Sequence, residues 1–161
     1  GEAAAVEAEL AANGLRRGER GLEVYVMVEI PSNVILLKEF ARHFDGFSIG
    51  SNDLTQLTLG IDRDSVLVSP LFSESDPAVL ELIGRAVRDA RAAGRKIGLC
   101  GQAPSDRPDF ARFLVDAGID SISFNPDALR RGMENMVAAE ARSDGGGGQK
   151  TDGNPVETGR A

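Results

Sequence analysis

The chain is poor in cysteine, histidine and tryptophan. Its 161 residues include one cysteine, one histidine and no tryptophan. A single cysteine cannot form an internal disulfide, so Cys100 is free for other chemistry and a cytoplasmic location is expected. The histidine, His43, falls in a helical stretch away from any predicted strand end, which favours a solvated position over a catalytic one.

Long apolar runs and an excess of basic residues are also absent. No segment approaches the roughly 20 apolar residues of a membrane-spanning helix, and the first residues lack the basic and apolar parts of a signal peptide. The net charge of -7 argues against binding to the phosphate backbone of nucleic acid. We therefore expect neither a membrane nor a nucleic-acid partner. Because the chain starts at Gly1 and has no methionine before Met27, we interpret it as a fragment of a longer protein.

Four apolar runs rich in β-branched residues are predicted to be buried parallel strands. The stretches between them carry apolar residues at helical spacing. The clearest of these has Asp76 as its N-cap, Pro77 in its first turn and Gly94 just after its end. The predicted strands are residues 24–30, 46–50, 97–100 and 121–124, and the predicted helices are residues 2–13, 33–44, 77–93, 108–117 and 127–141.

The alternation of strands and helices predicts an α/β fold with right-handed crossovers, either an open doubly wound sheet or part of a barrel. No G-x-G-x-x-G fingerprint of the open sheet follows a strand. Polar residues instead end the strands, as in barrel enzymes: Glu29, Asn52 with Asp53, Cys100 and Asn125. A complete barrel needs eight strands and about 250 residues. We therefore predict the C-terminal half of a (βα)8 TIM-type barrel over residues 1–142, followed by a disordered Gly-rich tail over residues 143–161.

Two carboxylates occupy equivalent positions one βα unit apart. Glu29 follows a buried strand, and Asp53 follows the next one. A carboxylate at a buried strand end is costly unless its charge is compensated. Each could cap the helix that follows it. As a pair at neighbouring strand ends, Glu29 and Asp53 could hold Mg²⁺, which prefers one or two carboxylates together with water and ligand oxygens.

Cys100 and Arg63 are the other candidates. Most lone cysteines are small buried hydrophobic residues, but the glycines that flank Leu99-Cys100 would let a substrate approach closely. At a strand end facing the barrel mouth, a thiol could donate a proton. Arg63 lies in a loop beyond Asp53 and would be an ordinary surface residue on its own. Next to a metal, its guanidinium could hold a phosphate or carboxylate.

Four ordered motifs resemble those of the PEP-utilising enzymes (PEP, phosphoenolpyruvate) over residues 10–140. They are VEIPS at residues 28–32, GFSIGSNDLTQ at 46–56, DR at 62–63 and CGQ at 100–102. Ser51 and Gln102 resemble the branch that makes PEP from pyruvate, ATP and water. The pyruvate phosphate dikinases and enzyme I of the sugar phosphotransferase system usually have Cys-Gly-Glu where this chain has Cys100-Gly101-Gln102.

The resemblance implies a role for each candidate residue. Glu29 and Asp53 would ligate Mg²⁺, while Ser51 and Asn52 would contact the phosphate and carboxylate of PEP, partly through backbone N–H groups. Arg63 would bind the phosphoryl group. Cys100 would exchange a proton with C3 of the pyruvate enolate. The enolate needs a Lewis acid in a dry, preorganised pocket, which agrees with these assignments.

The resemblance also implies parts that this sequence does not contain. The family uses an ATP-binding domain and a phosphohistidine on a swivelling domain, and His43 is not in the phosphohistidine motif. Arginines from the first half of the barrel are missing as well, and the full enzyme is expected to be a homo-oligomer. One alternative is therefore a catalytically inactive fragment. Another is a barrel lyase acting on Mg²⁺-bound oxo acids, which would not account for Cys100 or for Asn52-Asp53 with Arg63.

Overall fold

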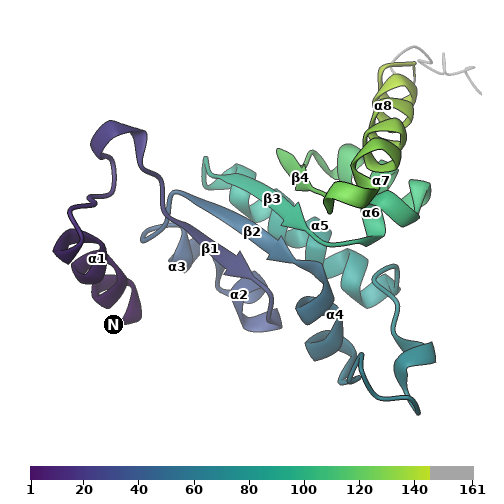
Figure 1. Cartoon of the computed structure of the whole chain (residues 1–161), viewed down its shortest axis with the longest axis horizontal. Helices are drawn as coiled ribbons and strands as arrows, with labels where there is room; N and C mark the ends of the chain where they lie inside the picture. Colours follow the sequence, from purple (N-terminus) through teal and green to yellow (C-terminus); the bar gives the residue numbers. More distant parts are fainter. Residues whose placement is uncertain (146–161) are drawn as a thin grey trace, which may run out of the picture.

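A computed structural model describes residues 1–145, with side chains described as far as Arg142. Parallel strands alternate with helices along the chain, and α1 lies apart from the sheet (Figure 1). No residue of α1 is buried. The strands are β1 (Tyr25–Val28), β2 (Gly46–Gly50), β3 (Lys96–Cys100) and β4 (Ser121–Ser123). The α-helices are α1 (Glu2–Ala12), α2 (Pro31–Ile35), α3 (Leu37–Phe40), α4 (Ser51–Leu59), α5 (Pro77–Ala92), α6 (Ala103–Asp106), α7 (Pro108–Ala117) and α8 (Leu129–Gly145).

The four strands form one parallel sheet in the order β1-β2-β3-β4. This confirms the predicted α/β class and the four predicted strands. Sequential order means that every crossover runs in the same direction, so the helices are placed on one side of the sheet. A doubly wound sheet would reverse its order and bury both faces. The order is that of a barrel wall.

Alternate strand residues build the core on one face of the sheet. Phe47 and Ile49 of β2 and Ile97 of β3 are fully buried, in a single cluster with apolar residues of α2, α3, α4, α5 and α7. The opposite face carries small or polar residues, apart from the half-exposed Tyr25 and Met27 of β1. Within residues 1–145, the sheet is therefore covered on one side only, as expected for a wall whose other face lines a barrel interior.

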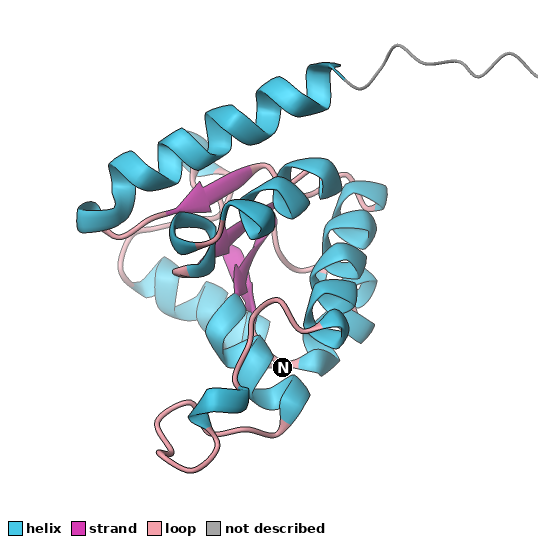
Figure 2. Ribbon diagram, turned by 90° about the vertical axis from the view of Figure 1, so that its right-hand side faces the viewer, coloured by secondary structure: helices cyan, strands magenta, loops and turns pink. Residues whose placement is uncertain are grey.

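The helices differ from the predicted ones in four places, one of which is the short helix α6, which was not predicted. Residues 33–44 do not form one helix, because the chain breaks at Leu36 (φ -102°, ψ 17°) between α2 and α3. Helix α4 was not predicted, although Gly60 ends it in a left-handed conformation. The last helix, α8, packs against α6 and α7 and is seen side-on in Figure 2. It continues to Gly145, and residues 146–161 of the predicted tail lie outside the described residues.

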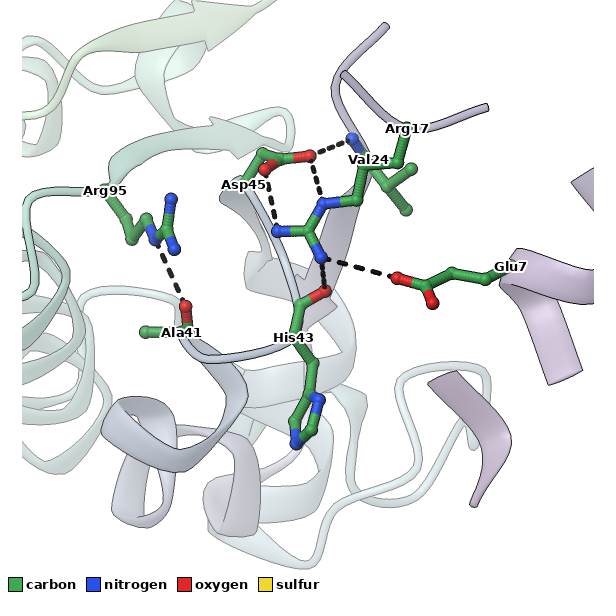
Figure 3. A network of polar contacts seen from close by, with 7 residues as sticks. All are labelled: Glu7, Arg17, Val24, Ala41, His43, Asp45 and Arg95. Atoms are coloured by element: carbon green, nitrogen blue, oxygen red, sulfur yellow. Dashed lines mark hydrogen bonds and ion pairs between the residues drawn. The ribbon is translucent and has the colours of Figure 1, made fainter. Parts of the chain in front are cut away.

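A network at the amino ends of β1 and β2 joins the N-terminal segment to the sheet (Figure 3). Arg17 donates two hydrogen bonds of 2.7 Å to the Asp45 carboxylate and a further one to the carbonyl of His43. Asp45 also accepts one from the backbone of Val24 at 2.9 Å. The Arg17 guanidinium holds the pKa of the Asp45 carboxyl below its usual value.

No helix in the described part of the chain is long and apolar enough to cross a membrane.

Candidate active site

The carboxyl ends of the four strands lie at one edge of the sheet because all the strands are parallel. Glu29 directly follows β1, Ser51 directly follows β2, and Cys100 is the last residue of β3. The register pairs Gly50 with Cys100, so the ends of β2 and β3 are level. The predicted site residues Glu29, Ser51 and Cys100 therefore come from one edge, opposite the Arg17–Asp45 network.

Glu29 is held at this edge by its neighbours on both sides. The side-chain oxygen of Asn33 accepts hydrogen bonds from the backbone N–H groups of Glu29 and Ile30, at 3.4 and 3.3 Å. The Glu29 side chain lies against Gly50 of the next strand, where an added Cβ would come within 3.3 Å of Oε2. Gly50 thus provides the space that lets this carboxylate lie across the end of β2.

The residues predicted to lie at the end of the second strand form the start of a helix. Ser51, Asn52 and Asp53 are the first turn of α4. The first N–H groups of a helix have no partner within the helix, and together with the helix dipole they favour an anion. Ser51 is fully buried, Asn52 is half-buried and Asp53 is exposed. This segment therefore offers backbone donors and one carboxylate.

Cys100 touches two serines of β2 and α4. The Ser48 hydroxyl lies 3.8 Å from the Cys100 sulfur, and the Ser51 hydroxyl donates to the Cys100 carbonyl at 3.5 Å. The next residue, Gly101, leaves room for Ser51, since an added Cβ would lie 2.1 Å from the Ser51 oxygen. The thiol and the start of α4 are thereby placed side by side.

A pocket of about 290 Å³ opens beside this contact. It is large enough for a three-carbon acid, and its wall is mainly polar. Its lining residues are Asn52, Cys100, Gly101, Gln102, Ser123, Phe124 and Asn125. Two of the sequence-predicted site residues, Asn52 and Cys100, therefore face one cavity.

The other predicted site residues do not line this pocket: Glu29, Ser51, Asp53 and Arg63. The Arg63 side chain is 50% exposed and lies 3.8 Å from the carboxylate of Asp64. Its backbone N–H donates to the side-chain oxygen of Gln56 at 3.3 Å, which ties the loop to α4. Arg63 is thus attached to the helix that starts the site, with its guanidinium directed to a weak, exposed partner.

Two residues at the site were not predicted from the sequence. Ser48 could have been predicted as a neighbour of Cys100. Side chains of a strand alternate between its two faces, so Ser48 and Gly50 of β2 share a face with Gly98 and Cys100 of β3. Glu74, far along the chain in the loop before α5, had no such signal. One of its carboxylate oxygens is buried and has no hydrogen-bond partner among the described residues. Burial raises the pKa of this carboxyl, although the Ser51 hydroxyl and the charge of Arg63 act in the opposite direction.

The donors at this edge fit a magnesium ion better than a metal held by the protein alone. In the described part of the chain, no three His, Cys, Asp or Glu side chains are grouped to hold a metal. Mg²⁺ takes only one or two carboxylates and completes its shell with water and substrate oxygens. Glu29 and Asp53 at neighbouring strand ends match that requirement in number and type.

The fold is that of a barrel-type α/β domain with a polar pocket at the carboxyl ends of its strands. Residues 2–141 match the family model of the PEP-utilising enzymes, PEP-binding domain. The chain belongs to this family.

The sequence is 59% identical over 135 residues to a phosphoenolpyruvate synthase of Synechocystis sp., covering 84% of this chain and 16% of that protein. It is 56% identical over 128 residues to the phosphoenolpyruvate synthase of Escherichia coli, covering 80% of this chain and 16% of that protein. The chain thus spans about one sixth of the length of these relatives. The citrate synthase SbnG superposes with a TM-score of 0.49 at 17% identity, covering 87% of this chain and 51% of that structure.

Proposed function

We propose that this chain is the pyruvate- and PEP-binding part of a phosphoenolpyruvate synthase. There it would transfer a phosphoryl group from a phosphohistidine to the enolate of pyruvate, with ATP and water consumed by the whole enzyme. The observation that carries the proposal is the contact between Cys100 and the first turn of α4 beside one polar pocket. A proton-exchanging thiol and an anion-binding helix start are the two groups that pyruvate enolisation requires.

The first turn of α4 would bind the charged groups of the substrate. The backbone N–H groups of Ser51 and Asn52 can each donate to a carboxylate or phosphoryl oxygen, and the positive end of the helix dipole adds to the attraction. Both residues are fixed before substrate arrives, since Ser51 is buried and Asn52 lines the pocket. Donors placed in advance stabilise negative charge without the cost of reorganisation.

Cys100 would carry the proton at C3. As a thiolate, its sulfur takes a proton from the methyl group of pyruvate. The electron pair of the broken C–H bond is then shared with the carbonyl group, which gives the enolate. The enolate oxygen then attacks phosphorus, the P–N bond to histidine breaks, and the histidine nitrogen leaves with the electron pair. The Ser48 hydroxyl, 3.8 Å from the sulfur, would orient the thiolate toward the pocket.

Glu29 and Asp53 would hold Mg²⁺, as the donor set allows. The ion would act as a Lewis acid for the negative charge that develops on the pyruvate oxygen. The Glu29 carboxylate is suited to this because it lies across Gly50, next to the first residue of α4. Asp53 is exposed in the first turn of α4, two residues after Ser51.

Arg63 would bind the phosphoryl group in transfer. Its planar guanidinium can make two parallel hydrogen bonds to phosphoryl oxygens. Its position one turn beyond the end of α4, fixed by Gln56, keeps it attached to the helix that binds the rest of the substrate.

The remaining steps would take place outside this chain, which spans 16% of its relatives. As the family resemblance implies, its partners would be an ATP-binding domain and a phosphohistidine domain of the same polypeptide, in a cytoplasmic homo-oligomer that supplies PEP for gluconeogenesis. By itself the chain is expected to bind substrate weakly and to lack phosphoryl transfer.

The test is exchange of the methyl protons of pyruvate with solvent deuterium in the presence of Mg²⁺, followed by proton NMR. It is made on a chimaera in which this chain replaces the matching 135 residues of the Synechocystis synthase. Replacing Cys100→Ala should lower the exchange rate by about 100-fold or more, the usual size of a general acid-base contribution. Ser121→Ala, at an exposed position near the start of β4, is the matched control.

Exchange by the same chimaera should also require the divalent ion. Asp53→Asn should raise the Mg²⁺ concentration needed for half-maximal exchange by about tenfold, because one charged ligand is lost. Full exchange by the Cys100→Ala variant, or none by the parent chimaera, would rule out this assignment.

A further inference from the structure

Asn125 is a polar residue at the end of the fourth strand for which the proposed chemistry has no use. It lies two residues beyond β4 and is the N-cap of the short 3-10 turn Pro126–Ala128. Asparagine at an N-cap commonly accepts a hydrogen bond through its side chain from the first N–H groups of the turn. Here the backbone carbonyl of Asn125 accepts from Ala128 at 3.0 Å, but the side chain makes no capping bond. Asn125 lines the pocket beside Cys100 instead.

Ser123 lies on the same side of this pocket. It is the register partner of Cys100 on the neighbouring strand, and it lines the same cavity. Phe124, between Ser123 and Asn125, packs against α8, since an added Cβ at Gly132 would lie 2.5 Å from its ring. The end of β4 is therefore held in place by α8. It forms a wall of the pocket, the β4 wall, that consists of Ser123 and Asn125 and carries one hydroxyl and one carboxamide.

The strand order places the β4 wall beyond C3 of the substrate. In the proposed function, the carboxylate of pyruvate binds at the first turn of α4, which follows β2, and its C3 atom lies at Cys100, the last residue of β3. Because the sheet runs in the order β1-β2-β3-β4, the direction from α4 to Cys100 leads next to the end of β4 (Figure 1). A substituent on C3 would therefore point toward Ser123 and Asn125.

We propose that Ser123 and Asn125 are specificity-determining residues, which favour pyruvate over 2-oxo acids that carry an apolar group on C3. The inference rests on the proposed function, which places C3 at Cys100. The pocket, of about 290 Å³ and with a mainly polar wall, has room for water between the methyl group of pyruvate and the β4 wall. The additional methyl group of 2-oxobutyrate would displace this water and leave the hydroxyl and the carboxamide without partners. Displacing water by a group that cannot replace its hydrogen bonds weakens binding.

The experiment compares the exchange of C3 protons with solvent deuterium for pyruvate and for 2-oxobutyrate, using the chimaera with Mg²⁺. The parent should exchange pyruvate at least about tenfold faster, because unpaired polar groups oppose the longer acid. Asn125→Leu keeps the approximate size of the side chain and removes its polar atoms, so it should narrow this ratio about fivefold through faster exchange of 2-oxobutyrate. Ser123→Ala should narrow the ratio in the same direction. Asp127→Ala is the matched control, since Asp127 lies in the same turn but does not line the pocket.

The ratio of the two rates does not depend on how much of a variant is folded, because both acids use the same site. Asn125→Ala is a second variant that removes the carboxamide, and it should narrow the ratio as well. An unchanged ratio in both Asn125 variants, or an equal change in Asp127→Ala, would overturn the proposal. If the parent chimaera does not exchange the protons of pyruvate, the proposed function itself fails. If the parent exchanges both acids equally fast, only the role of the β4 wall fails.

Discussion

Cys100 shows how much the chemistry of one residue depends on its immediate neighbours. It is followed by Gly101 and lies beside Ser48, at the end of a strand whose residues Ile97 and Leu99 are buried in the core. The alternation turns Cys100 away from that core, so its sulfur reaches the pocket. A cysteine one residue earlier would have been buried among apolar side chains and unable to exchange a proton.

A substitution of Ser48 tests whether the neighbours of Cys100 affect its reactivity. Ser48→Ala removes the only side-chain partner of the sulfur in the described part of the chain, so the sulfur loses its fixed orientation. We expect the methyl-proton exchange of pyruvate by the chimaera to slow about fivefold, corresponding to one weak hydrogen bond.

The control for this variant is Ser121→Ala, which removes a hydroxyl from the neighbouring edge strand at a distance from the sulfur. An equal decrease in both variants would show that the loss comes from general loosening of the sheet. An unchanged exchange rate in Ser48→Ala would show that the hydroxyl has no part in orienting the thiol.

Elements of this chain are held together in two ways, by apolar packing and by a polar pair. Helix α5 packs on β2 and β3 through a fully buried stripe that includes Val79, Ile83 and Val87. The segment before β1, in contrast, is joined to the sheet by Arg17 and Asp45. The stability that this ion pair adds depends on pH, whereas the stability that the apolar contacts of α5 add does not.

The contact between Asp45 and Arg17 is predicted to stabilise the fold in a pH-dependent way. Its pKa is lower in the folded chain than in the unfolded one because of Arg17, so the pair adds full stability above the unfolded value of about 3.8. As the pH falls below that value, the unfolded chain takes up a proton first, and the added stability is lost through the folded pKa. Asp45→Asn should cost about 1–3 kcal/mol at neutral pH.

Urea unfolding of the chain at several pH values measures this contribution. The difference in free energy of unfolding between the parent and Asp45→Asn should shrink as the pH falls from 5 to about 3. Glu39→Gln is the matched control, since its ion pair with Arg42 is exposed and worth little. A difference that stays constant with pH would mean that Asp45 does not stabilise the chain through its charge.

At the scale of the molecule, the sheet has two strand edges and one face that helices do not cover. The edge strands are β1 and β4. The uncovered face has Tyr25 and Met27 exposed to 39% and 37%. Its other positions are glycines, serines, Lys96 and Cys100, so most of this face is not apolar. Unpaired edges remain the main feature that favours association.

We therefore expect the chain on its own to self-associate with increasing concentration. Met27→Lys places a charge on the open face of the edge strand β1 and should weaken association between chains. A loss of about 1.4 kcal/mol for each chain-to-chain contact would lower the association constant about tenfold. Sedimentation velocity at several concentrations measures this, with Lys38→Met on a helix as a control for charge. A monomer at all concentrations would contradict the expectation.

The sequence by itself determined the four strands, their parallel arrangement and the edge at which Glu29, Ser51 and Cys100 lie. These features follow from local patterns: apolar runs, turn signals and the direction of parallel strands. Helix α4 was not predicted: Ser51, Asn52 and Asp53 were expected just after the second strand, and the burial of Leu54 and Thr55 accompanies the helix that they begin. Roles for these residues came from resemblance to a family and remain predictions.

Only the tertiary structure decided which distant residues meet. Glu74 has no strand-end position and no motif of its own, yet it lies against Ser51 and Gly101. Arg63, which follows Asp53 closely in sequence, points instead to Asp64. The physical reason is that strand patterns fix the direction of each element, whereas the path of a loop depends on packing between elements that are far apart along the chain.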